Sequence, residues 1–129
     1  MKQIEFKSSD YGSTLTFDVT ERTSDEISFN VSVKTPWFYG IAPASTIHVG
    51  SPAQLFREMA AERNGWSQEK TWIDLEQRVS FEATCDLTGH VNLIVTLAGQ
   101  DYESRLRAVI KYDLGQLGKM SDDLSLLLG

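Results

Sequence analysis

Residues 79–97 read VSFEATCDLTGHVNLIVTL, and this stretch decides the fold class. Apolar residues occupy every second position on both sides of the segment Asp86–Gly89, whose residue types favour a turn. Side chains of a strand point alternately to its two faces, so each half of the stretch predicts a strand with one buried and one polar face. The stretch is therefore predicted to be a hairpin of an antiparallel sheet.

The same alternation recurs in four other segments, at residues 4–7, 14–20, 27–34 and 105–112. Pro36 is expected to end the third of these segments, because proline cannot donate a hydrogen bond to a strand ladder. Short turns separate the strands within each run, which favours hairpins between strands that are neighbours in sequence. Six strands are predicted in all.

Two helices are predicted from their boundary residues. Residues 52–64 have apolar side chains at helical spacing, with Ser51 as the expected N-cap, Pro52 at the first helical position and Gln54 completing a capping box. The segment 64–65, Asn-Gly, is expected to stop this helix in a left-handed conformation. A second, short helix is predicted from Ser121 to the C-terminus, because a serine cap is followed there by two acidic residues and a run of leucines.

The order of these elements, strands, helix, strands and a terminal helix, is typical of the α+β class. We expect residues 1–129 to form a single α+β domain in which a curled antiparallel sheet of about six strands surrounds one helix. A sandwich or a partial barrel remains open as the form of that sheet.

Composition limits the classes of partner. Twelve basic and eighteen acidic residues give a net charge of −6, which has the wrong sign for nonspecific binding to nucleic acid. No apolar run approaches the roughly 20 residues that a membrane-spanning helix needs, and the N-terminus lacks the apolar stretch of a secretory signal. The single cysteine, Cys85, excludes an internal disulfide, so a cytoplasmic location is expected.

The residues with reactive side chains predict no catalytic centre. Cys85 and His90 flank one turn and could form a thiolate–imidazole pair, but Cys85 shares a face with the core residues of its strand and His90 lies at a polar position. Only Cys85, His48 and His90 could supply soft ligands for zinc, and the three do not occur together in one segment, which argues against a zinc site. We therefore expect no enzyme activity, no metal and no cofactor.

Three groups of residues are candidates for a binding surface. Trp37, Phe38 and Tyr39 are adjacent aromatics that could anchor a partner, or else plug the sheet and pack under the helix. Three basic residues at one face of the last strand could bind an anion, or else pair with Glu82 or Glu103; they are Arg105, Arg107 and Lys111. Four acidic residues near the N-terminal hairpin could attract a basic partner; they are Asp18, Glu21, Asp25 and Glu26.

The C-terminal half resembles a family of small bacterial proteins of unknown function. The resemblance rests on Trp72 and Leu75, on the pattern Gly-His-Val-x-Leu-x-Val that starts at Gly89, and on residues 115–117, Gly-Gln-Leu. Tyr102 stands where that family has a tryptophan. Such families are similar in size and setting to immunity-type proteins, which neutralise toxins secreted by neighbouring bacteria. The resemblance carries no catalytic residues.

The leading hypothesis is a non-enzymatic partner-binding domain, with an immunity-type inhibitor of a basic toxin as its specific form. The acidic residues would attract the toxin and the aromatics would anchor it. The alternative is a small-molecule binder with a cavity between the sheet and helix 52–64, near Phe17, Phe29, Phe56 and Met59. A homodimer through an edge strand or through Leu124–Leu128 is a further expectation, because so many leucines need a cover.

Overall fold

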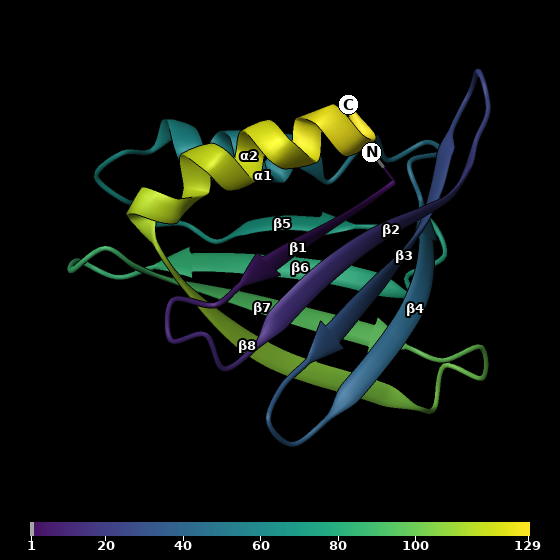
Figure 1. Ribbon diagram of the computed structural model, residues 1–129, viewed down its shortest axis with the longest axis horizontal. Coiled ribbons are helices and arrows are strands. Elements are labelled where there is room, and N and C mark those ends of the chain that lie inside the picture. Colours follow the sequence, from purple (N-terminus) through teal and green to yellow (C-terminus); the bar gives the residue numbers. More distant parts are fainter. Residues whose placement is uncertain (1) are drawn as a thin grey trace.

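The computed structural model describes residues 2–129 and contains two antiparallel sheets and two helices (Figure 1). The first sheet has the strand order β1-β2-β3-β4, and the second has the order β5-β6-β7-β8. The strands of the first sheet are β1 (Gln3–Lys7), β2 (Thr14–Arg22), β3 (Ile27–Lys34) and β4 (Tyr39–Ser45). Those of the second are β5 (Lys70–Ile73), β6 (Val79–Cys85), β7 (His90–Ala98) and β8 (Arg105–Asp113). Helix α1 (Ala53–Ala61) connects the sheets, and α2 (Leu114–Leu128) follows β8.

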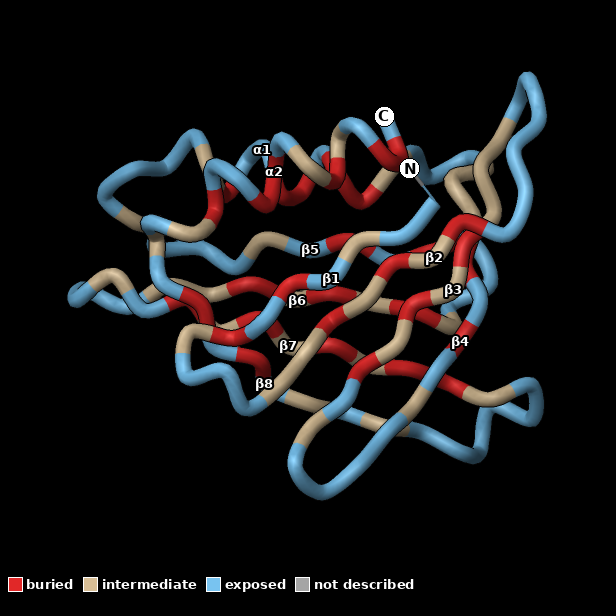
Figure 2. The backbone as a smooth tube through the Cα atoms, in the orientation of Figure 1, coloured by how far each residue is buried: buried red, intermediate tan, exposed pale blue. Residues whose placement is uncertain are grey.

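The two sheets face each other across one hydrophobic core, and their strands cross (Figure 1). The two helices pack side by side, with α2 against β1 and α1 against β5. They therefore cover the side of the molecule where these two edge strands lie (Figure 1). Figure 2 shows buried residues along the strands of both sheets and along the helices, whereas the hairpin turns are mostly exposed.

The α+β class is confirmed, but the prediction of one six-stranded sheet around one helix is wrong. The chain has eight strands in two separate sheets, which form a sandwich and not a closed barrel. Sequence analysis missed β4 and β5. β4 contains Gly40 and Pro43, two residues that are unfavourable in strands, and β5 is only 4 residues long.

Pro43 fits in β4 because this strand is the edge of its sheet. β4 pairs with β3 from Ser28 opposite Ser45 to Lys34 opposite Tyr39. Just beyond the end of this ladder, Thr46 donates its N–H to the carbonyl of Ile27. Successive residues of an antiparallel strand point their backbone groups to opposite sides. The even-numbered residues of β4 therefore bond to β3, and Pro43 faces the open side, where no donor is needed.

The helix boundaries also differ from the predicted ones. Helix α1 begins after Pro52, not Ser51, and ends at Ala61. The capping box expected with Gln54 does not form, because the Gln54 side chain accepts a hydrogen bond from Arg57 instead. Glycine does follow the helix in a left-handed conformation, since Gly65 has φ +88°.

The C-terminal helix is twice as long as predicted. It starts at Leu114, where Asp113 and Gln116 form a capping box that the sequence analysis did not identify. Gly115 and Gly118 lower the helix propensity of this segment, so the sequence did not predict the first two turns of the helix. Neither helix combines the length and apolarity of a membrane span within residues 2–129.

Candidate functional site

A tight hairpin turn between β3 and β4 presents the three adjacent aromatic residues. The Thr35 hydroxyl accepts the backbone N–H groups of Trp37 (3.2 Å) and Phe38 (3.0 Å), and the Thr35 N–H donates to the carbonyl of Phe38 (2.8 Å). Pro36 suits the second position of such a turn because its φ is fixed. These bonds fix the backbone, so the aromatic side chains project from a defined position.

All three aromatic side chains face solvent. Trp37 is 83% exposed, Phe38 70% and Tyr39 62%, and Ile41, two residues further along β4, is 55% exposed. The alternative in which these aromatics plug the sheet and pack under the helix is therefore wrong. Sequence analysis missed Ile41, although the spacing of Tyr39 and Ile41 is that of one strand face. We call these four side chains the aromatic surface.

A groove of about 250 Å³ runs beside the aromatic surface. One wall is formed by Tyr39, Gly40 and Ile41 of β4, and the other by the β7–β8 hairpin, including Arg105 and Leu106. A methyl group on Gly40 would lie 2.9 Å from Cδ1 of Leu106, so β4 and the Leu106 side chain approach each other closely at this glycine. The groove joins the aromatic candidates to one member of the basic candidates.

Two positively charged residues lie beside the aromatic surface. Lys34 lies opposite Tyr39 in the β3–β4 register, and Arg105 lines the groove. Within residues 2–129, no ion pair involves Lys34, Arg105 or Arg107. The expected alternative, pairing of the basic strip with Glu82 or Glu103, is therefore not observed.

Only one residue of the basic strip lines the groove. Arg105, Arg107 and Lys111 are all exposed on the outer face of β8, but only Arg105 reaches the groove. Lys111 lies opposite Asn92, and its carbonyl accepts the N–H of Ser9 at 2.8 Å. This end of β8 is thus held by the β1–β2 loop.

The acidic candidates lie away from the aromatic surface. Glu21, Asp25 and Glu26 belong to the β2–β3 hairpin, whose tip projects at the opposite end of β3 from the aromatic turn (Figure 1). β3 has 8 residues, so at a rise of about 3.3 Å per residue its two ends are about 23 Å apart. Asp18 lies between them, opposite Gln3 and Asn30 in the sheet. The structure therefore separates the acidic residues from the aromatic residues.

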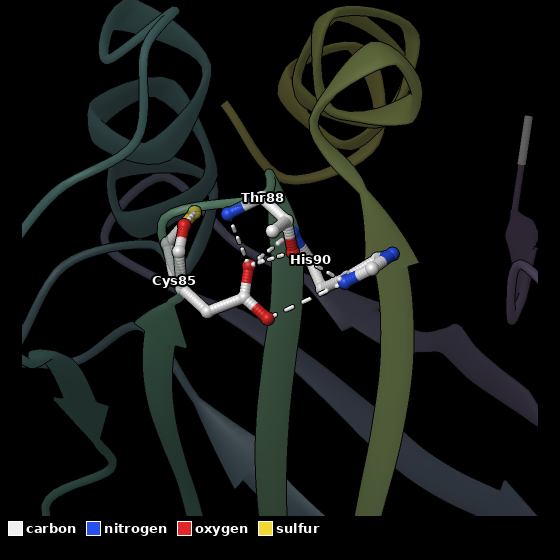
Figure 3. Close-up of polar contacts among 4 residues, drawn as sticks. Cys85, Thr88 and His90 are labelled. Atoms are coloured by element: carbon white, nitrogen blue, oxygen red, sulfur yellow. Dashed lines mark hydrogen bonds and ion pairs between the residues drawn. The ribbon is translucent and has the colours of Figure 1, made fainter.

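The turn between β6 and β7 orders a polar network but no catalytic pair (Figure 3). The His90 Nδ1 lies 2.8 Å from the Thr88 hydroxyl and 3.3 Å from an Asp86 oxygen. The Cys85 thiol donates to the Asp86 carbonyl at 3.4 Å, and Figure 3 shows the sulfur and the imidazole pointing away from each other. Cys85 is half-buried, not fully buried as expected.

The Asp86 carboxylate is the centre of this network. Its pKa is lowered from 3.8 to about 2, first because it accepts the N–H of His90 and then because it accepts the hydroxyl and N–H of Thr88. Hydrogen bonds from these donors favour the charged form. The network therefore stabilises the turn.

The place that the small-molecule alternative assigned to a ligand is filled by side chains. The ring of Phe17 lies 6.2 Å from that of Phe56 and 5.8 Å from that of Phe81, measured between centroids. Phe29 and Met59 are also fully buried. These contacts are those of a packed interior.

The leucines proposed as a dimer surface are also covered within the chain. Leu124, Leu127 and Leu128 are buried, whereas Leu126 is 75% exposed. Arg22 donates to the Leu127 carbonyl at 2.8 Å, which ties β2 to the end of α2. The C-terminal leucines therefore belong to the core.

Two of the larger grooves contain a candidate residue: Cys85 lines the first, and Glu26 and Phe29 line the second. The first, about 750 Å³, contains Trp66 and Lys70, whose ammonium lies 5.7 Å from the Trp66 ring and 3.8 Å from Glu62. The second, about 390 Å³, lies between the β5–β6 turn and β2–β4, and Glu26 is in its wall. Within residues 2–129, no three His, Cys, Asp or Glu side chains are grouped to hold a metal ion.

In a comparison with known families, residues 6–129 match DUF6228, a family of unknown function. No curated protein shows significant similarity to the chain.

Proposed function

The chain belongs to the DUF6228 family of unknown function, and from its own surfaces we propose that it is a non-enzymatic partner-binding domain. The observation that carries this proposal is the aromatic surface, where three aromatic side chains and Ile41 are exposed together on an ordered turn and strand. Large contiguous apolar areas on a soluble domain are typical of interaction sites.

The order of the turn makes these side chains effective anchors. Aromatic residues bring a large apolar area to a contact, and the bonds to Thr35 have already fixed the backbone that carries them. A central aromatic anchor contributes about 2 kcal/mol or more to binding, which corresponds to about a 30-fold change in Kd. Trp37, the most exposed of the aromatics, is the proposed central anchor.

Affinity capture from a lysate of the source organism tests this proposal. Wild-type protein is compared with Trp37→Ala and with Leu87→Ala, which removes a fully exposed apolar side chain at the distant β6–β7 turn. The proposal predicts a stoichiometric partner that wild type and Leu87→Ala retain and Trp37→Ala loses. Equal retention by all three proteins would contradict it.

An immunity-type inhibitor of a basic toxin is a second candidate function. Its support is the acidic β2–β3 hairpin with Glu21, Asp25 and Glu26, in a chain of net charge −6. Opposite charges accelerate association and make it dependent on salt. This candidate predicts that Glu21→Gln with Asp25→Asn slows association with the captured partner, whereas an unchanged rate and salt dependence would exclude it.

A further inference from the structure

The open edge of β4 offers unused backbone groups directly beside the aromatic surface. β4 has a neighbour only on its β3 side. Since its even-numbered residues bond to β3, the N–H and C=O groups of Tyr39 and Ile41 point to the open side, together with the C=O of Pro43. An edge of this kind can pair with an added strand.

The groove lies along this edge, and an extended chain that paired with β4 would also contact the groove. β4 residues form one wall, and apolar Leu97 and Leu106 lie in the opposite part of the groove. An added strand would place alternate side chains toward these leucines and the others toward solvent. The groove therefore favours a segment that alternates apolar and polar residues.

The charged residues beside the groove indicate whether the polar residues of the added segment are acidic or basic. Arg105 is the only charged residue among those that line the groove, and Lys34 lies opposite Tyr39 in the sheet; neither forms an ion pair within the described chain. Asp101 and Glu103 belong to the β7–β8 turn but are not among the residues that line the groove. The positive charge of Arg105 in the groove wall therefore favours an acidic segment.

We propose that the β4 edge binds an acidic, extended segment of a partner protein, which adds to the first sheet as a fifth strand next to Tyr39 and Ile41. This inference rests on the proposed partner-binding function and specifies its geometry and partner chemistry. Main-chain hydrogen bonds supply affinity, while the apolar groove and the cations supply specificity. Trp37 and Phe38 then anchor the body of the partner beyond that segment.

Two fluorescently labelled, end-capped peptides probe the edge, the acidic EVEFEVE and its basic counterpart KVKFKVK. Fluorescence anisotropy with the purified full chain is expected to show binding of the acidic peptide and about tenfold weaker or no binding of the basic one. Absence of binding, or preference for the basic peptide, overturns the inference. Because capture by the aromatic surface is measured separately with Trp37→Ala, such a result leaves the proposed function standing.

Methylation of peptide nitrogens tests the strand pairing without changing the protein. Only one edge of the added strand faces β4, so methylation of alternate nitrogens on that edge abolishes binding and methylation on the other edge is tolerated. Equal binding of both methylated peptides would mean that the peptide does not pair as a strand.

Ile41→Pro tests the same bond from the protein side. The substitution removes an N–H that does not bond to β3. Residue 41, like Pro43, points its backbone groups to the open side of β4, so β4 is expected to remain in the sheet. The expected loss of peptide affinity is about tenfold relative to Ile41→Ala, which also lacks the isoleucine side chain but keeps the N–H. Equal affinities of these two variants would contradict the inference, as would a free protein that is already a dimer with β4 amides protected from exchange.

Discussion

Phe56 is the side chain that joins α1 to both sheets. Its ring lies 5.8 Å from that of Phe6, 6.2 Å from that of Phe17 and 6.3 Å from that of Phe81, measured between centroids. It is completely buried. Phe56→Ala therefore removes contacts with both sheets at once and leaves a cavity that the surrounding rings can only partly fill.

The expected loss is about 3–5 kcal/mol of unfolding free energy, from a total of about 5–15 kcal/mol for a domain of this size. With a urea m-value of about 2 kcal/mol/M, a loss of 4 kcal/mol lowers the unfolding midpoint by about 2 M. Urea unfolding followed by circular dichroism measures this shift. Phe38→Ala is the matched control, because Phe38 is 70% exposed and its removal should change stability by less than about 0.5 kcal/mol.

A loss below about 1 kcal/mol for Phe56→Ala, with an unchanged m-value, would refute the reasoning. It would mean that the space between the sheets is not closely packed, and the small-molecule alternative would regain its cavity. Equal losses for Phe56→Ala and Phe38→Ala would contradict the assignment of buried and exposed rings.

Three further changes have expected outcomes. The pKa of Asp86 is lowered from 3.8 to about 2 by folding, so its contribution to stability is complete above about pH 4 and is lost as the pH falls through about 2. Asp86→Asn should therefore reduce the dependence of the urea midpoint on pH between these values. The same pH dependence in the wild type and the variant would contradict this. Tyr112→Phe removes the buried hydrogen bond from the phenol to the Phe6 carbonyl (2.9 Å) and should cost about 1–3 kcal/mol in thermal unfolding, whereas an unchanged melting temperature would show that the carbonyl finds another donor. Gly65→Ala places a methyl group on a residue with φ +88° and 3.0 Å from the Cys85 sulfur, so it should lower the unfolding free energy by about 1–2 kcal/mol. Gly115→Ala adds a methyl group in a helix with no atom within 4 Å and should raise the unfolding free energy by up to about 1 kcal/mol. Calorimetry that found Gly65→Ala more stable than Gly115→Ala would disprove the argument.

Alternation of apolar residues was sufficient to predict six of the eight strands and the α+β class. It could not separate one curled sheet from two sheets, because each strand has one buried face in either arrangement. β4 was missed for a physical reason, since Gly40 and Pro43 are tolerated only where the strand is an open edge, and this is known only after the sheet order. The start of α2 was missed because the tertiary packing of Leu117 compensates for the low helix propensity of Gly115 and Gly118.

The candidate site was predicted in its parts but not in its arrangement. The aromatic residues 37–39 could be identified from their composition, whereas their exposure depends on the β3–β4 turn. The closeness of Arg105 to Tyr39 could not be predicted, because it results from the crossing of two sheets that are distant in sequence. The same geometry separates the acidic hairpin from the aromatic surface, although the two are neighbours along the chain.

Hydrogen–deuterium exchange of the chain in complex with its captured partner tests the central claim most directly. The account predicts that binding slows exchange in residues 35–41, at the aromatic turn and the β4 edge, and leaves residues 21–28 unchanged. Protection confined to residues 21–28 would place the contact on the acidic hairpin and contradict the assignment of the aromatic surface as the partner-binding site.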